Sequence, residues 1–203
     1  MSAMTVSDLP LRGWIFDLDG TLTVAQHDFA AIRRELGIPA EEDILEHLGR
    51  LPIAERDELN ARLDDIELRL ASQVEPAPGA AELIRELHGR GARLGILTRN
   101  LRTVALASLD RIGVVECFAP EHVLGRNDTA PKPAPDGIHQ LLAGWQLRRE
   151  QAVMVGDFRF DLEAGRAAGC HTCLVHPDNS WPALADLHVP DCHALLAQVR
   201  SAG

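Results

Sequence analysis

The stretch WIFDLDGTLT, residues 14–23, combines a predicted buried strand with two closely spaced aspartates. Its first three residues form a short apolar run, which is typical of a β-strand that is covered on both faces. Because strand residues two apart point the same way, Asp17 and Asp19 should face one spot at the strand's end. Two such carboxylates repel each other unless a cation or a substrate keeps both ionised. Folding gains nothing from the pair, so the stretch predicts a chemical role for it.

The whole composition is that of a globular protein, with 203 residues, 46% hydrophobic and 25% charged. A formal net charge of -10 argues against nucleic acid or an anionic membrane as the main partner. No apolar run approaches the roughly 20 residues that span a bilayer, and the first residues lack the features of a signal peptide. We therefore expect a cytoplasmic protein with neither a nucleic acid nor a membrane as partner.

The pair Cys170 and Cys173, with His176 nearby, raises the question of a zinc or redox site. The chain offers no second ligand pair at matching spacing for zinc. A redox pair would sit at a helix N-terminus, whereas residues 171–175 have a strand pattern, in which residues three apart face opposite sides. We expect buried structural thiols.

Strand and helix patterns alternate from residue 92 onward, after a helix pattern at residues 77–91. This alternation implies a parallel sheet with helices on both faces, a three-layer Rossmann-like α/β fold. In such sheets ligands bind at the carboxyl ends of the strands. Strands are expected at residues 92–98, 117–119, 151–157 and 171–175, and helices at residues 101–113, 134–145 and 160–169.

A helical insertion separates the first strand from the rest of this pattern. Residues 27–74 are charged, helical in period and free of strand signals, with stops at Gly37 and Pro52. We predict a core of residues 1–23 and 76–203 and a small helical cap of residues 24–75. Placed after the two aspartates, the insertion is a candidate lid; the alternative is a helical hairpin that only pads the surface.

Polar residues also follow the other predicted strands. If the strand ends converge, four carboxylates gather with one lysine, and they cannot all stay ionised without a cation. Oxygen ligands with room for waters and a phosphate suit Mg²⁺. The residues concerned are Thr98, Arg99 and Asn100 after one strand, Asp157 and Asp161 after another, and Lys132 in a loop between Pro131 and Pro133.

Some of these residues have structural alternatives. Thr98 and Asn100 are also suited to cap the helix that begins near Leu101. Asp161 is also suited to a helix N-terminus, where the helix dipole favours an acid. Lys132 is harder to explain structurally, because the following proline restricts the backbone of Lys132. A lysine on the solvent-exposed surface does not need a restricted backbone.

The motifs DLDGT, LT, KP and GDxxxD occur here in the order found in the haloacid dehalogenase superfamily of phosphatases. The chain resembles that superfamily over nearly its whole length, because the helical insertion corresponds to the superfamily's cap. The forms DxDGT, KP and GDxxxDxxAGxxAG are most similar to the phosphoglycolate phosphatase-like branch. The resemblance implies a phosphoric monoester hydrolase that acts on a small phosphorylated metabolite.

Carried over by position, the resemblance makes Asp17 the nucleophile that takes the phosphoryl group. Asp19 becomes the general acid that protonates the leaving oxygen and then the base that activates water. An aspartyl phosphate divides one difficult hydrolysis into two easier steps. Gly20 lets the backbone approach the phosphate. The residues expected to bind the phosphate are Gly20, Thr98, Arg99, Asn100 and Lys132.

The same resemblance implies a Mg²⁺ site. Asp157 would ligate the ion together with the Asp17 carboxylate and the Asp19 backbone carbonyl. Asp161 would support the waters of the metal. Phosphoryl transfer depends on positioning and charge neutralisation, which such a site provides.

The sequence departs from the branch in ways that weaken any substrate name, phosphoglycolate included. Val24 and Ala25 stand where an acid and a serine are frequent, and Arg99 stands where a smaller polar residue is common. Arg99 would hold a second group of the substrate, or else point outward and pair with a surface acid. His27 and Asp28 are further candidates for contact with the leaving group.

Several functions other than phosphatase activity are alternatives for this sequence. A true 2-haloacid dehalogenase lacks the aspartate two residues after its nucleophile, so Asp19 argues against that reaction. A phosphosugar mutase uses the same core and stays an alternative, while pyrophosphate or nucleotide substrates would leave the reaction class unchanged. A non-catalytic binding module would tolerate loss of the motif residues, which are all present.

Overall fold

The computed structural model describes residues 4–24 and 29–202. Six strands form one sheet in the order β3-β2-β1-β4-β5-β6, and every neighbouring pair runs parallel. β1 lies between β2 and β4, so the first aspartates follow a strand in the middle of the sheet. The strands are β1 Gly13–Phe16, β2 Arg93–Leu97, β3 Val123–Leu124, β4 Ala152–Gly156, β5 His171–Val175 and β6 Leu187–Val189.

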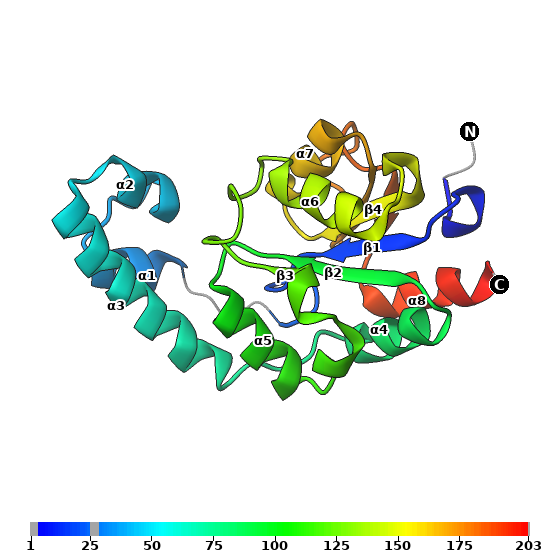
Figure 1. Ribbon diagram of the computed structural model, residues 1–203, viewed down its shortest axis with the longest axis horizontal. Helices are drawn as coiled ribbons and strands as arrows, with labels where there is room; N and C mark the ends of the chain where they lie inside the picture. The colour runs from blue at the N-terminus through cyan, green and yellow to red at the C-terminus, as the bar shows by residue number, and fades with distance from the viewer. Residues whose placement is uncertain (1–3, 25–28, 203) are drawn as a thin grey trace.

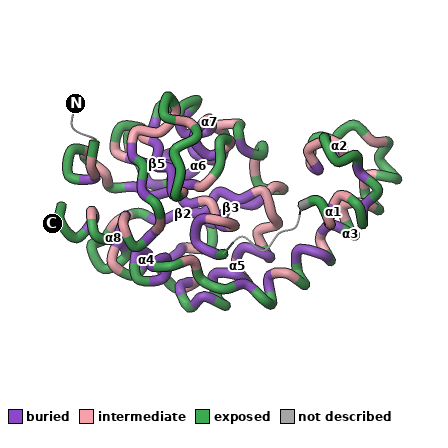
Figure 2. The backbone as a smooth tube through the Cα atoms, turned by 180° about the vertical axis from the view of Figure 1, so that it is seen from behind, coloured by how far each residue is buried: buried purple, intermediate pink, exposed green. Residues whose placement is uncertain are grey.

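Helices cover both faces of this sheet (Figure 1). Trp14 and Phe16 pack in one hydrophobic cluster with residues of α4, α5 and α8, whereas Ile15 packs in a second cluster with residues of α6 and α7. Buried residues are concentrated in the sheet and the helix sides that face it (Figure 2). The predicted three-layer α/β fold is confirmed. These helices are α4 Ala80–Gly89, α5 Arg102–Arg111, α6 Asp136–Trp145, α7 Arg159–Ala168 and α8 Cys192–Ser201.

The predicted short strand at residues 117–119 is wrong. Short 3-10 helices, Val115–Cys117 and Pro120–His122, occupy this segment, and the strand that follows is β3. β3 has two residues, too few to produce an alternating pattern. The strand β6, with three residues, and the helix α8 were not predicted.

The insertion folds as three helices, α1 Phe29–Leu36, α2 Ile44–Arg50 and α3 Ile53–Ala71. Its two ends lie side by side, because the Val24 amide donates a hydrogen bond to the Glu75 carbonyl at 2.9 Å. Figure 1 shows the three helices beyond the carboxyl ends of the strands, with α3 running back toward α5. A separate cap domain with boundaries at residues 24 and 75 stays a prediction. The helices share their own hydrophobic cluster of Ile32, Leu36, Ile38, Ile44, Leu48, Leu63 and Ile66.

All four cysteines are free and buried. Cys170 and Cys173 belong to the clusters on opposite faces of the sheet, as the strand pattern predicted. Burial raises the pKa of the Cys170 thiol to about 11. These thiols therefore act as small apolar side chains, and the pair does not share one site.

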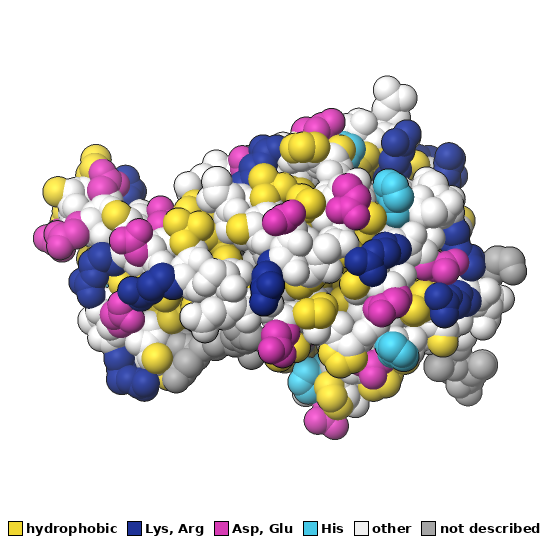
Figure 3. All heavy atoms as spheres, turned by 90° about the horizontal axis from the view of Figure 1, so that it is seen from below, with side chains coloured by type: hydrophobic (Ala, Val, Ile, Leu, Met, Phe, Trp, Pro, Cys, Tyr) yellow, Lys and Arg dark blue, Asp and Glu magenta, His cyan; other side chains and the backbone are white. Residues whose placement is uncertain are grey.

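The surface carries charges of both signs. Figure 3 shows acidic and basic side chains interspersed over the face that it presents, without a large basic region. In the part of the chain that the structure describes, no helix combines the length and apolar character needed to cross a bilayer.

Candidate active site

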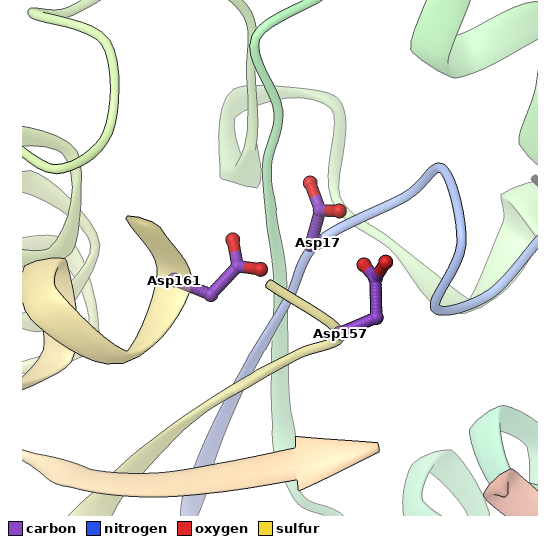
Figure 4. Close-up of side chains that lie close together, drawn as sticks. All are labelled: Asp17, Asp157 and Asp161. Atoms are coloured by element: carbon purple, nitrogen blue, oxygen red, sulfur yellow. The ribbon is translucent and has the colours of Figure 1, made fainter. Parts of the chain in front are cut away.

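Three carboxylates meet at the carboxyl ends of neighbouring strands. Asp17 follows β1, Asp157 follows β4, and Asp161 lies in the first turn of α7. Because β1 and β4 are paired in parallel, with Phe16 beside Val155, their following residues reach the same edge. One oxygen from each carboxylate lies within 4.8 Å of the others, and Figure 4 shows the three groups turned toward one another.

The pKa values of this acidic cluster are displaced upward. Burial, followed by the charges of Asp17 and Asp161, raises the pKa of Asp157 to about 7. Burial also raises the pKa of Asp161 to about 6, against the opposing effect of Lys132. Without a further cation, the cluster therefore does not hold all of its carboxylates ionised at neutral pH. An all-oxygen donor set of this kind fits Mg²⁺, which prefers carboxylates and waters.

Lys132 supplies the cation that the cluster contacts directly. It lies in the loop between β3 and α6 and is 3% exposed. Its Nζ atom is 2.5 Å from Asp17 Oδ1 and 2.7 Å from Asp161 Oδ1. Burial acts to lower the pKa of Lys132, but Asp161 and Asp17 outweigh that effect and raise it. The lysine thus stays charged inside the cluster.

Asp161 is held at the N-terminus of α7 and also contacts Lys132, while its support of metal-bound waters stays a prediction. Its carboxylate accepts a hydrogen bond from the Phe158 amide at 3.0 Å, as expected of an acid in the first turn of α7. The same side chain pairs with Lys132. The helix N-terminus therefore holds the carboxylate in place beside the lysine.

Thr98 and Asn100 do not cap α5. The helix has Leu101 at its N-cap position, without a side-chain capping bond, so that alternative is wrong. Thr98 is 3% exposed and its hydroxyl accepts a hydrogen bond from the Asn100 amide at 3.1 Å. Asn100 Nδ2 donates to Asp19 Oδ2 at 2.6 Å. The end of β2 therefore supports Asp19.

The turn formed by the DGT residues after β1 packs against Asp157 of the acidic cluster. Gly20 has a φ of 88°, which disfavours other residues, and a Cβ atom there would overlap the Asp157 carboxylate. Thr21, which was not among the predicted site residues, donates from Oγ1 to Asp157 Oδ1 at 3.0 Å. The carboxylate cluster does not include Asp19, whose carboxylate lies against Asn100.

One cavity of about 480 Å³ joins these residues to the insertion. Its boundary includes Asp17, Asp19, Thr98, Lys132, Asp157 and Asp161 from the core, and Ile32, Arg33, Asp43, Ile44, Leu63 and Glu67 from the insertion. The insertion therefore borders the site and does more than pad the surface. Whether it moves as a lid stays a prediction.

Arg99 lies at this boundary and does not pair with an acid on the outer surface. Its Nη2 atom is 2.6 Å from Oδ1 of Asp43, the N-cap residue of α2. Its guanidinium also lies 5.1 Å from the ring centre of Phe160. Both partners line the same cavity. His27 and Asp28 lie outside the described residues.

A buried ion network ties the insertion to the core and was not predicted. Arg126 and Glu67 have side chains that are each 6% exposed, and they pair at 2.6 Å. Arg126 also contacts Asp64 of α3 and donates to the Arg99 carbonyl at 3.4 Å. Burial raises the pKa of Glu67, although Arg126 opposes the effect. No sequence pattern signals this contact, because its partners are 59 positions apart.

The sequence model of the family described as "Haloacid dehalogenase-like hydrolase" matches residues 14–175. The chain belongs to this family. A haloacid dehalogenase-like hydrolase domain-containing protein of Arabidopsis thaliana is 34% identical, over 81% of this chain and 71% of its own. A phosphoglycolate phosphatase of Caulobacter vibrioides is 31% identical, over 84% of this chain and 81% of its own.

Solved structures show the same fold. A hydrolase from Pseudomonas syringae superposes with a TM-score of 0.74 at 21% identity, covering 95% of this chain and 99% of that one. The Rhodobacter sphaeroides protein CbbY, solved in complex with phosphate, has a TM-score of 0.71 at 21% identity, covering 94% and 99%. The family model and the phosphoglycolate phosphatases among the relatives confirm the predicted resemblance to that branch and the predicted enzyme class, phosphoric monoester hydrolase.

Proposed function

We propose that this protein is a Mg²⁺-dependent phosphatase that hydrolyses a small phosphate monoester through an aspartyl phosphate on Asp17. The observation that carries the proposal is the meeting of Asp17, Asp157 and Asp161 around the buried Lys132. The carboxylate that we propose as the nucleophile lies beside a buried lysine, at the edge of a parallel sheet where ligands bind, and this supports the proposal.

In the first step, Asp17 attacks phosphorus and the bond from phosphorus to the leaving oxygen breaks. Asp19 gives a proton to that oxygen, with its carboxyl group oriented by Asn100 Nδ2. In the second step, Asp19 takes a proton from water, which attacks the phosphoaspartate and frees Asp17 and inorganic phosphate. Positioned acid–base groups of this kind contribute about 10²–10⁴-fold to a rate.

Lys132 and Thr98 are proposed to bind the oxygens of the transferring phosphoryl group. Both residues are buried and border the cavity, Thr98 directly after β2 and Lys132 in the loop between β3 and α6. Lys132 also lowers the cost of bringing an anion to Asp17, because it already lies 2.5 Å from that carboxylate. Fixed charges in a site with little water stabilise a developing charge more strongly than charges in bulk solvent do.

Asp17 and Asp157, with the backbone carbonyl of Asp19, would hold the Mg²⁺, and Asp161 would support its waters. The bound ion supplies charge neutralisation for the phosphoryl oxygens. The raised pKa values of Asp157 and Asp161 support this assignment, since they indicate that Lys132 alone does not keep all of these buried carboxylates ionised.

A small phosphorylated metabolite is the proposed substrate. A cavity of about 480 Å³ that the insertion borders fits such an ester better than a phosphoprotein. Two of the relatives are phosphoglycolate phosphatases, and their name refers to a small phosphate ester, which supports a substrate of similar size here.

The test measures phosphate release from p-nitrophenyl phosphate and from a panel of small esters. We expect turnover with Mg²⁺, loss of turnover with excess EDTA, and recovery when Mg²⁺ is restored. Asp17→Asn should abolish turnover while circular dichroism shows an unchanged fold. Full activity in excess chelator, or steady turnover by a folded Asp17→Asn protein, would contradict the mechanism. Transfer of phosphate to a sugar phosphate in preference to water would identify a mutase.

A further inference from the structure

The segment 98–101, between β2 and α5, carries Asn100 to Asp19 and lies outside regular secondary structure. Its main-chain groups therefore need hydrogen-bond partners from elsewhere in the protein. The Arg99 carbonyl accepts a hydrogen bond from Arg126 Nη1 at 3.4 Å. The Asn100 carbonyl accepts one from the Arg126 amide at 2.9 Å. Arg126 thus holds two consecutive carbonyl groups of the segment.

Arg126 is in turn fixed by α3 of the insertion. Its Nη1 atom donates to both carboxylate oxygens of Glu67, at 2.7 and 2.6 Å, and its Nη2 atom donates to Asp64. Glu67 also accepts a hydrogen bond from the Leu101 amide, which acts to lower the pKa of Glu67. A buried network with several hydrogen bonds of this kind favours one arrangement of its members. The insertion is therefore bound both to Arg126 and to the segment itself.

The segment also packs closely against the loop after β3. A Cβ atom added to Gly125 would lie 2.4 Å from the Arg102 amide nitrogen and 2.7 Å from the Asn100 carbonyl oxygen. The main chains approach each other so closely that only a glycine fits at this position. The segment is therefore enclosed by the loop after β3 and is bound to α3.

Asn100 connects this segment to the proposed acid–base group. Its Nδ2 atom donates to Asp19 Oδ2 at 2.6 Å, whereas Thr23 Oγ1 lies 3.5 Å from Asp19 Oδ1. Asn100 therefore makes the shorter of these two contacts with the carboxyl group. Proton transfer requires an acid within hydrogen-bond reach of the leaving oxygen, about 2.6–3.2 Å, so a small displacement of Asp19 slows the reaction.

We propose that Glu67 and Arg126 are positioning residues, which hold Asn100 so that Asp19 stays directed at the leaving oxygen. The insertion thereby builds part of the acid–base site through α3, in addition to bordering the cavity. This inference rests on the proposed phosphatase mechanism, because it concerns the step in which Asp19 gives its proton.

The experiment compares aryl phosphates of similar size that differ in the acidity of the leaving phenol. The series is p-nitrophenyl, p-chlorophenyl, phenyl and p-methoxyphenyl phosphate. A weakly acidic phenol leaves slowly as its anion, so its ester depends more on the proton from Asp19 than p-nitrophenyl phosphate does. We measure kcat/KM for each ester with Mg²⁺ present. A change that only weakens the fold lowers all four values by the same factor.

The main variant combines Arg126→Met with Glu67→Leu. Replacing both members of a buried ion pair with apolar residues is often tolerated, whereas removing one member leaves a buried charge without its partner. The value of kcat/KM should fall about tenfold for p-methoxyphenyl phosphate and less than about threefold for p-nitrophenyl phosphate. The matched control combines Arg69→Met with Glu35→Leu. It removes an exposed ion pair between α3 and α1, at residues that do not line the cavity, and should leave all four values unchanged.

Asn100→Ala tests whether the pair acts through Asn100. If it does, adding the pair variant to Asn100→Ala should not steepen the dependence on the leaving group any further. Arg126→Lys keeps a cation beside Glu67 but lacks the guanidinium fork, so it should show a smaller loss of the same kind. Thermal unfolding identifies the variants that are folded at the assay temperature, and Arg126→Lys decides the matter if the pair variant is not.

The outcomes separate this inference from the proposed function. The inference is supported by a loss that grows from p-nitrophenyl to p-methoxyphenyl phosphate, is absent from the control and does not add to that of Asn100→Ala. An equal loss on all esters, no loss, or full additivity with Asn100→Ala overturns the inference alone, because wild-type turnover still supports the phosphatase activity. Absence of turnover by the wild-type protein overturns the inference and the proposed function together.

Discussion

Asp157→Asn should make the metal-free protein more stable at alkaline pH, although it removes a proposed Mg²⁺ ligand. Burial and the neighbouring carboxylates raise the pKa of Asp157 from 3.8 to about 7. The folded protein therefore keeps this proton to a higher pH than the unfolded chain does. Above the folded-state pKa the native state must hold an ionised Asp157 that is buried beside other carboxylates, which costs free energy. An asparagine at this position stays neutral and avoids that cost.

The size of the effect follows from the pKa displacement. About three pKa units at 1.36 kcal/mol each correspond to about 4 kcal/mol of lost stability once pH exceeds 7. The contribution of protonated Asp157 to the free energy of unfolding is fully present below the unfolded-state pKa near 4. This contribution is lost as pH rises through the folded-state pKa. Because Asp161 has a pKa raised to about 6 and shares the cluster, the two effects overlap. We therefore expect a gain of about 2 to 4 kcal/mol for Asp157→Asn at pH 8.

The assay is urea unfolding of wild-type protein and Asp157→Asn in EDTA, at several pH values from 5 to 8. The stability difference should be smallest at pH 5 and should grow until pH exceeds the folded-state pKa of about 7. Mg²⁺ should stabilise the wild type more at pH 8 than at pH 5, because only the ionised cluster binds it. Asp178→Asn, at an exposed carboxyl, is the control and should show no such trend. Equal stability of wild type and Asp157→Asn at pH 8 in EDTA would refute the reasoning.

Two further predictions concern the residues packed against the cluster. Lys132→Ala should lower kcat at least 10²-fold, about 2.7 kcal/mol, because the lysine neutralises Asp17 and the phosphoryl oxygens; steady-state kinetics that show a change in KM alone would mean that it only attracts substrate. Gly20→Ala should lower both stability and kcat, since its φ of 88° is unfavourable for alanine and the new Cβ meets Asp157. Thermal unfolding and phosphate release measure these losses, and wild-type values for both would contradict the prediction.

Much of the active site could be predicted because it depends on local patterns and one rule of topology. The apolar run before Asp17 and the alternation of strands and helices indicate parallel strands, and the carboxyl ends of parallel strands meet at one edge. Asp17 and Asp157 follow paired strands, so their convergence needs no knowledge of side-chain packing. The short elements β3 and β6 were missed or misplaced, because two or three residues carry too little periodicity.

By itself the sequence determined the fold class, the helical insertion and the residues that gather at the strand ends, since each follows from periodicity or from motif position. Only the tertiary structure decided which partners the arginines take: Arg126 with Glu67, Arg99 with Asp43, and Arg33 without a carboxylate among the described residues. Those partners come from segments far apart in the chain. Their meeting depends on how α1, α2 and α3 pack beyond the sheet, and no local pattern of residues specifies that geometry.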